Sequence, residues 1–309
     1  MRSESAGDFL LALNSAEGLL QAVLGRREKE AYILVAYGEI QAPAQGAEKL
    51  TPLIRQIFVE GGLEAGHLER IAAVRGPGGF TGLRLGPVTA AGLARATGAV
   101  QAGIDYLPLL AQSARQVYGK HPACERGDLW AIVHARRNLV YAQAFAGPES
   151  TVVLNAAGSA TQLRAKASAS QSPGPRALSE LLILPPSELA LLVAAYAAKS
   201  AAPPLLLGSG LDKNREEFAR ILCAQAGKFP RAQARLLPPE YSRPLPEALL
   251  DMAVSLEYGT ADIDPFYARP ADAEEKLEDI ALSLGLDPVA ARARYQSLSK
   301  QRPGGSGSF

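Results

Sequence analysis

The sequence predicts an α/β protein made of two related lobes, with mixed β-sheets and flanking helices. Two observations predict this fold class. The apolar segments of the first half follow the order β, β, β, α, β, α, and a second block of strands and glycine turns comes after them. The chain has 309 residues, 48% of them hydrophobic, which is enough to bury about two cores. We expect a first lobe over residues 9–122, a second, smaller lobe over 123–270, and a helical extension with a flexible tail over 271–309.

Three short apolar runs predict a β-meander at the start of the first lobe: Phe9–Leu13, Leu19–Leu24 and Ala31–Val35. The hydrophobic period then becomes helical from Ala47, and Gly61 supplies a stop signal. The predicted helix carries one apolar stripe, formed by Leu50, Leu53, Ile54, Ile57 and Phe58.

A glycine-rich turn follows the next predicted strand, Ile71–Val74. The loop Gly76–Phe80 leads into a helix that we expect Thr81 to cap and Gly98 to end. Glycines at this density indicate unusual backbone angles or close packing. They also permit phosphate binding at a helix N-terminus, although the spacing matches neither a P-loop nor the dinucleotide fingerprint. The candidate phosphate-binding residues are Gly76, Gly78, Gly79, Gly208 and Gly210.

The second lobe is predicted to begin with two apolar strands, Leu129–Val133 and Val140–Phe145, joined by a basic turn. Residues 147–176 have no sustained periodicity and indicate a variable connection. The strand Leu205–Leu207 then leads through a second glycine turn into a polar helix. The remaining expected helices are a core helix over Leu189–Ala198, one over Pro246–Tyr258, and two over Pro270–Lys300 broken at Pro288.

Composition narrows the function classes. The chain has 32 basic and 31 acidic side chains, so no overall positive charge predicts RNA binding by the chain alone. Cys124 and Cys223 lie far apart, and no two of the three histidines, His67, His121 and His134, have the spacing of a metal site. No segment has the length of a membrane span or a signal-peptide core, and we expect a cytoplasmic protein.

Five landmarks in order resemble the TsaB (YeaZ) family. Arg75–Arg84 reads R-G-P-G-G-F-T-G-L-R and resembles that family's signature R-G-P-G-S-F-T-G-[LV]-R. Glu48–Ile54 is similar to its H-[ST]-E-x-L-x-P-x-[IL] helix, and His134–Tyr141 to its D-A-R-[RM]-x-[EQ]-V-Y hairpin. Leu207–Gly210 resembles its V-G-x-G turn, and Pro265–Arg269 its closing P-x-Y-[LV]-R.

The sequence departs from the family pattern at three positions. The family opens with A-[IL]-D-T-[SA], whereas this chain has Asn14 in place of the carboxylate that related actin-like ATPases use near metal-nucleotide. Ala47 and His134 replace the usual residues before Glu48 and in the hairpin. These departures weaken the expectation of nucleotide chemistry and leave the packing motifs intact.

The resemblance implies an actin-like, ribonuclease-H-like two-lobed fold of the ASKHA superfamily. It also implies a non-catalytic scaffold subunit without a cofactor of its own. In that family the subunit binds TsaD, which with a TsaE-type ATPase and ATP transfers a threonylcarbamoyl group to N6 of adenosine 37 in tRNAs that read ANN codons. The subunit would touch tRNA only through the complex and would form a homodimer without TsaD. The implied partner-binding residues are Leu50, Ile54, Gly82, Leu85, Gly86, Thr89 and Ala90.

Two alternatives stay open. An actin-like nucleotide-binding enzyme would use Gly76–Gly82 and Gly208–Gly210 to hold phosphates across a cleft. An M22-type, glycoprotease-like peptidase would need an activated nucleophile, and Gly208-Ser209-Gly210 is an incomplete nucleophile elbow. Arg136 and Arg137 are secondary candidates for contact with RNA or an acidic partner.

Overall fold

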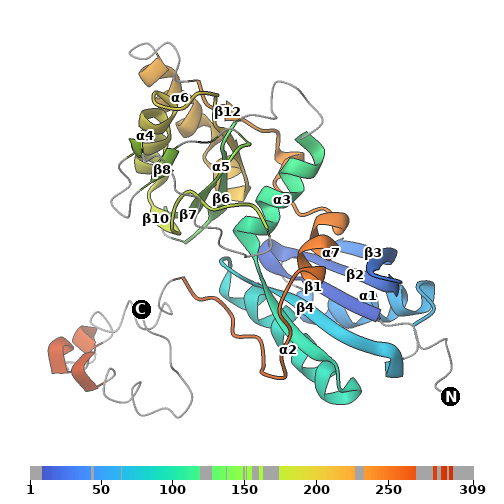
Figure 1. The fold of residues 1–309 in the computed structure, drawn as a ribbon. Helices are drawn as coiled ribbons and strands as arrows, with labels where there is room; N and C mark the ends of the chain where they lie inside the picture. The colour runs from blue at the N-terminus through green and yellow to red at the C-terminus, as the bar shows by residue number, and fades with distance from the viewer. Residues whose placement is uncertain are drawn as a thin grey trace. The chain divides into compact units, whose positions relative to one another are not determined.

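The computed structural model describes residues 9–42, 45–63, 65–118, 127–136, 138–148, 150, 152–154, 160–162, 174–226, 233–268, 281–283, 287–290 and 292–294. The chain divides into two units, Met1–Phe266 and Tyr267–Phe309. The first unit contains both five-stranded β-sheets (Figure 1). The described part of the second unit includes helical residues at 281–283, 288–290 and 292–294. Most of the helical pair expected over Pro270–Lys300 lies outside the described residues.

The first sheet has five strands in the order β3-β2-β1-β4-β5. Antiparallel pairing joins β1 (Phe9–Asn14), β2 (Leu19–Glu28) and β3 (Ala31–Gln41), which confirms the predicted meander. Parallel pairing joins β1 to β4 (Leu68–Gly76) and β4 to β5 (Val100–Asp105). A short 3₁₀ turn, η1 (Ala16–Gly18), connects β1 to β2.

The second sheet repeats this pattern in the order β10-β7-β6-β11-β12. Antiparallel pairing joins β6 (Leu129–His134), β7 (Val140–Phe145) and β10 (Leu182–Leu184), and β6 pairs in parallel with β11 (Leu205–Leu207). Next to β11 lies β12 (Arg235–Leu236), also parallel. Both sheets therefore have the same strand order and directions, as the predicted actin-like duplication requires. A separate pair, β8 (Val152–Leu154) and β9 (Ala160–Gln162), lies within the expected variable connection.

Helices cover both faces of the first sheet (Figure 1). On one face lie α1 (Gly46–Glu60) and α2 (Phe80–Thr97), whose apolar residues share a core with alternate residues of β1. On the other face, α7 (Pro246–Val254) packs against β1 and β2. The helix α3 (Tyr106–Tyr118) contacts strands of both sheets. The core under α1 and α2 includes Phe9, Leu11, Leu13, Leu50, Ile54, Ile57, Ala90 and Ala94.

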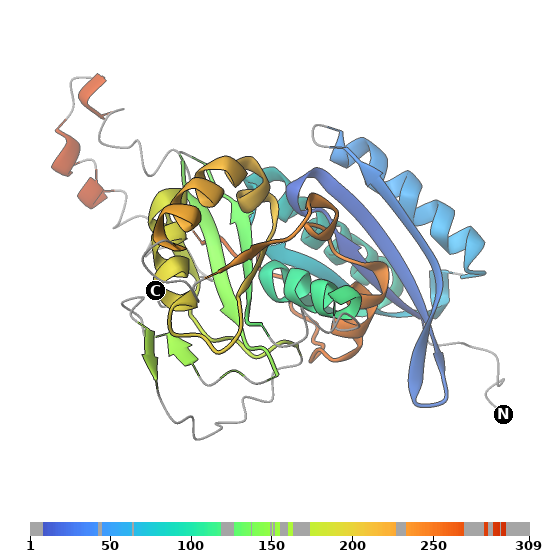
Figure 2. The same ribbon diagram turned by 90° about the horizontal axis from the view of Figure 1, so that it is seen from above.

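The second sheet packs against α4 (Pro186–Ala197) and α6 (Arg215–Ala226), which lie together in Figure 2. Trp130 and Ile132 of β6 share this core with Val193 of α4 and Phe218 of α6. The core helix expected near Leu189 is thereby confirmed. A five-residue helix, α5 (Ser209–Lys213), follows β11 and contacts β6.

Three sequence expectations differ from the structure. The N-cap of α2 is Gly79 rather than Thr81, because the helix already begins at Phe80. The predicted second-lobe range includes α7, yet α7 packs against the first sheet. The elements β5 and α3 were not predicted, although both belong to the first lobe's range. Among the described helices, none combines the length and the apolar character that a bilayer span needs.

Candidate partner-binding face and glycine turns

The turn after β1 is attached to α2 by the side chain of Ser15. The Ser15 hydroxyl donates a hydrogen bond to the Gly82 carbonyl oxygen at 2.6 Å and accepts one from the Gly86 amide at 3.0 Å. A Cβ atom at Gly82 would lie 2.4 Å from the Ser15 carbonyl oxygen, and one at Gly86 would lie 3.0 Å from its hydroxyl. The two glycines therefore allow α2 to approach the strand end closely.

Equivalent turns after β4 and β11 use glycines in the same manner. Gly76 has φ +131°, and its Cβ would lie 2.8 Å from the Phe266 carbonyl oxygen. Gly208 has φ +110°, and its Cβ would lie 2.2 Å from the Ile132 carbonyl oxygen. At Gly210 a Cβ would come within 2.9 Å of β6. Contacts within the protein account for these three glycines, which favours the close-packing interpretation over a phosphate cradle.

The two remaining phosphate candidates lie at the start of α2. Gly78 would make only ordinary contact with Leu83 if it carried a Cβ, and Gly79 has open space around it. Gly79 also accepts the first backbone hydrogen bond of the helix, from the Leu83 amide. Neither glycine supplies a side chain that would select a nucleotide.

Asn14, which replaces the family's aspartate, is fully buried and holds the turn together. Its side-chain amide donates to Gln21 at 3.0 Å, and its carbonyl oxygen accepts from the Ala16 amide at 3.0 Å. Gln21 continues the network by donating to the backbone oxygen of Pro244. Asn14 thus supplies a donor and an acceptor to its neighbours, so its present role is structural.

A polar cluster connects the same turn to the second sheet. The Ser209 hydroxyl donates to the Glu17 carboxylate and accepts a hydrogen bond from the backbone amide of His134. Burial is the main cause that raises the pKa of Glu17 from 4.5 to about 7. Burial, with Lys213 nearby, lowers the pKa of His134 below its ordinary value. The sequence marks His134 as a departure from the family pattern and as one of three histidines without metal-site spacing, and it gives no signal for Glu17.

The structure places four of the seven expected partner-binding residues in the interior of this chain. Leu50, Ile54, Gly86 and Ala90 are buried within this chain, because the apolar stripes of α1 and α2 face the first sheet. The other three, Gly82, Leu85 and Thr89, are half-buried. A Cβ at Gly46 would lie 2.9 Å from Leu85, so Leu85 fills the junction of the two helices.

The outward faces of the two helices carry apolar side chains that are not among the expected partner-binding residues. Val59 of α1 is 76% exposed and Val88 of α2 is 68% exposed. They are the two most exposed large apolar side chains that the structure describes up to Phe266. No periodicity argument could find them, because each lies on the polar side of its helix.

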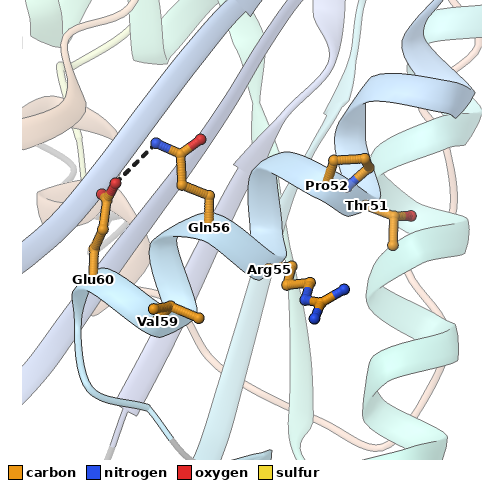
Figure 3. A pocket seen from close by; sticks show the side chains of 6 residues that line it. All are labelled: Thr51, Pro52, Arg55, Gln56, Val59 and Glu60. Atoms are coloured by element: carbon orange, nitrogen blue, oxygen red, sulfur yellow. Dashed lines mark hydrogen bonds between the residues drawn. The ribbon is translucent and has the colours of Figure 1, made fainter.

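An open hollow of about 510 Å³ runs along the outward face of α1. Its lining residues are Thr51, Pro52, Arg55, Gln56, Val59 and Glu60. Figure 3 shows Gln56 donating to Glu60, at 2.8 Å, while the Arg55 side chain extends away from that pair. The face thus has an exposed apolar side chain, Val59, with charged and amide groups near it. Such a composition is suited to binding another protein.

The remaining candidates from the sequence are scattered. Cys223 and Arg136 are exposed, and His67 is half-buried. His121, Cys124 and Arg137 lie outside the described residues. In the described part of the chain, no group of three or more His, Cys, Asp or Glu side chains could hold a metal ion.

The described residues define a duplicated, actin-like α/β protein whose glycine turns bring helices close to strand ends. A family model described as "TsaD: tRNA N6-adenosine threonylcarbamoyltransferase" matches residues 41–210. The match spans more than half of the chain, and the chain belongs to this family.

The curated relatives include a TsaB protein and a threonylcarbamoyltransferase. The tRNA threonylcarbamoyladenosine biosynthesis protein TsaB of Haemophilus influenzae is 32% identical over 133 residues, which are 43% of this chain and 51% of that protein. A tRNA N6-adenosine threonylcarbamoyltransferase of a Ruegeria species is 38% identical over 96 residues, which are 30% of this chain and 25% of that protein. The chain thus spans about half or less of the curated relatives that it matches.

Two solved structures show the same fold. A Pseudomonas aeruginosa protein described as similar to peptidase YeaZ has a TM-score of 0.59 at 23% identity, covering 85% of this chain and all of that one. YeaZ from Pseudomonas aeruginosa has a TM-score of 0.54 at 21% identity, covering 92% of this chain and 97% of that one. At these identities the likeness establishes the two-lobed fold, and it confirms the fold class predicted from the sequence.

Proposed function

We propose that this chain is a TsaB-type scaffold subunit that binds a TsaD-type transferase through the outward faces of α1 and α2. The observation that carries the proposal is the exposure of Val59 and Val88 on two helices that cover the same face of the first sheet. Family membership supports the partner class.

The geometry suits docking because both helices are held firmly from beneath. Leu50, Ile54 and Ile57 fix α1 on the sheet, and Ser15 fixes α2 through Gly82 and Gly86. A rigid face loses little conformational entropy on binding. Burying each exposed valine would contribute about 1–2 kcal/mol, and the polar groups around the hollow would set the register of the partner.

In the proposed complex this chain contributes surface and the partner contributes the chemistry. The complex would modify N6 of adenosine 37 in tRNAs that read ANN codons, with ATP used together with a TsaE-type ATPase. The same helix face would support a homodimer when the transferase is absent. Contact with tRNA would occur through the partner, since this chain carries 32 basic and 31 acidic residues.

The test is a binding titration of the purified chain with the TsaD-type protein of the same organism, followed by tRNA threonylcarbamoylation with all components present. We expect Val59→Glu and Val88→Glu each to weaken binding at least about tenfold, because a desolvated, unpaired carboxylate costs more than 1.4 kcal/mol. The matched control is Leu191→Glu, a charge placed on an apolar residue of α4 that is 47% exposed. It should bind like the native chain.

Two results would count against the proposal. Equal affinity of all four proteins would remove α1 and α2 as the docking face. Threonylcarbamoylation or ATP hydrolysis by the purified chain alone would replace the scaffold role with an enzymatic one.

A further inference from the structure

One side-chain contact directly joins the turn of the first sheet to the second sheet. Glu17 lies in η1, immediately after β1, and has a left-handed backbone conformation with φ +55°. Ser209 begins α5, after β11, and its hydroxyl donates to the Glu17 carboxylate. The two residues are 192 positions apart in the sequence. Non-glycine residues rarely adopt this backbone conformation, which indicates that the surrounding structure holds Glu17 in place.

Four further groups face Glu17 from the elements around it. The Tyr106 hydroxyl of α3 forms a hydrogen bond with the carboxylate, and Lys213 of α5 attracts its charge. Asp212, also of α5, repels that charge, although Arg215 pairs with Asp212 at 2.9 Å. His134 of β6 contributes its backbone amide to Ser209. Since the pKa of His134 is lowered, its ring is neutral near pH 7 and adds no positive charge there.

The balance of these effects disfavours the ionised carboxyl. Burial outweighs the two hydroxyl donors and Lys213, so the pKa of Glu17 is raised to about 7 rather than lowered. A protonated carboxyl keeps an acceptor oxygen for Ser209 and Tyr106 and has no charge to desolvate. An ionised carboxyl accepts stronger hydrogen bonds from Ser209 and Tyr106, but desolvation costs it more than these bonds return. A movement that opens the Ser209 contact and brings water to the half-buried Glu17 would favour the ionised form.

We propose that Glu17 and Ser209 form a proton-operated latch, which holds the two lobes together while the carboxyl is protonated and loosens when it ionises. The latch is independent of the proposed docking face. It makes the distance between the lobes depend on pH around neutrality, where a cell's pH varies.

A spin-label distance measurement tests the latch directly. One label is attached to native Cys223 on α6, which is exposed, and the second to a Glu30→Cys substitution in the exposed turn between β2 and β3. Cys124→Ser removes the other cysteine. We expect a narrow distance distribution at pH 5.5 that becomes longer and broader by pH 8.5, with a midpoint near pH 7.

Two variants separate the latch from general effects of pH. Glu17→Gln keeps an acceptor for Ser209 and cannot ionise, so its distribution should stay narrow from pH 5.5 to 8.5. Glu188→Gln removes an exposed glutamate of α4 and should titrate like the native chain. A second, independent measurement is the titration of the Glu17 carboxyl by carbon NMR in the unsubstituted chain.

The outcomes decide the matter. An unchanging distance in the native chain, or the same pH response in Glu17→Gln, would overturn the latch. A carboxyl of Glu17 that titrates near 4.5 would overturn it too, even where the glutamine variant does not fold.

Discussion

The Ser15 hydroxyl lies between the carbonyl oxygen of Gly82 and the amide of Gly86, at 2.6 and 3.0 Å. These two groups are the natural i, i+4 partners of an α-helix, so a side chain from the first strand's turn enters the hydrogen-bond ladder of α2. Pro87 follows directly and has no amide to donate. Ser15 therefore determines how the start of α2 is attached to the sheet.

Ser15→Ala should lower the free energy of unfolding by about 1–3 kcal/mol, because the buried amide of Gly86 loses a partner. Urea unfolding of the native and variant chains measures this difference. Ser255→Ala is the matched control, since the Ser255 hydroxyl bonds a backbone carbonyl at an exposed site. Equal losses in the two variants would show that the bridge to α2 has no special role.

Gly82→Ala should separate α2 from the strand end. Its Cβ would lie 2.4 Å from the Ser15 carbonyl oxygen, and backbone must move to relieve that clash. We expect a loss of about 1–3 kcal/mol in unfolding free energy, and weaker binding of the proposed partner. Gly92→Ala in the same helix has no neighbour within 4 Å and should gain about 0.5–1 kcal/mol. Stabilisation by both alanines would contradict the close packing at Gly82.

Hydrophobic periodicity predicted α1 and α2 well but could not say which of their apolar residues face outward. Leu50 and Ala90 recur at helical spacing, which identifies an apolar stripe without saying whether a sheet or a partner covers it. The structure shows that the sheet covers both residues. The exposed valines, Val59 and Val88, interrupt polar faces as single residues, and single residues carry no periodic signal.

The polar cluster could not be predicted for a different reason. Glu17 and Ser209 meet only because the first and second sheets pack in one unit, and 192 positions separate them. The glycine turns, in contrast, could be read locally: Gly76 and Gly208 both follow a strand and both have positive φ. The sequence alone leaves phosphate binding open at these turns, and the positions of neighbouring backbone atoms favour close packing.

Asn14→Asp restores the residue type that the family has at this position and should destabilise this chain. The site is fully buried, and an aspartate cannot donate to Gln21 as the asparagine amide does. We expect a loss of about 2–3 kcal/mol at pH 7, smaller at pH 5, because burial would raise the pKa of the new carboxyl. Asn138→Asp, in an exposed turn, is the control and should change little. A variant as stable as the native chain would show that the side-chain amide of Gln21 rotates, so that its NH₂ group donates to the new carboxylate.

The free energy of unfolding should fall as pH rises from about 4.5 to about 7, by about 2–3 kcal/mol through Glu17. In this window the unfolded chain has already released the proton of Glu17, whereas the folded chain still holds it. The folded state binds more protons, so raising the pH favours unfolding.

Denaturant unfolding at pH 5, 6, 7 and 8 measures the slope of the unfolding free energy against pH. Glu17→Gln should remove the part of the slope that comes from Glu17. Glu188→Gln should keep the same slope as the native chain. A slope that is unchanged in Glu17→Gln would mean that the carboxyl of Glu17 ionises freely in the folded chain, as an exposed carboxyl does.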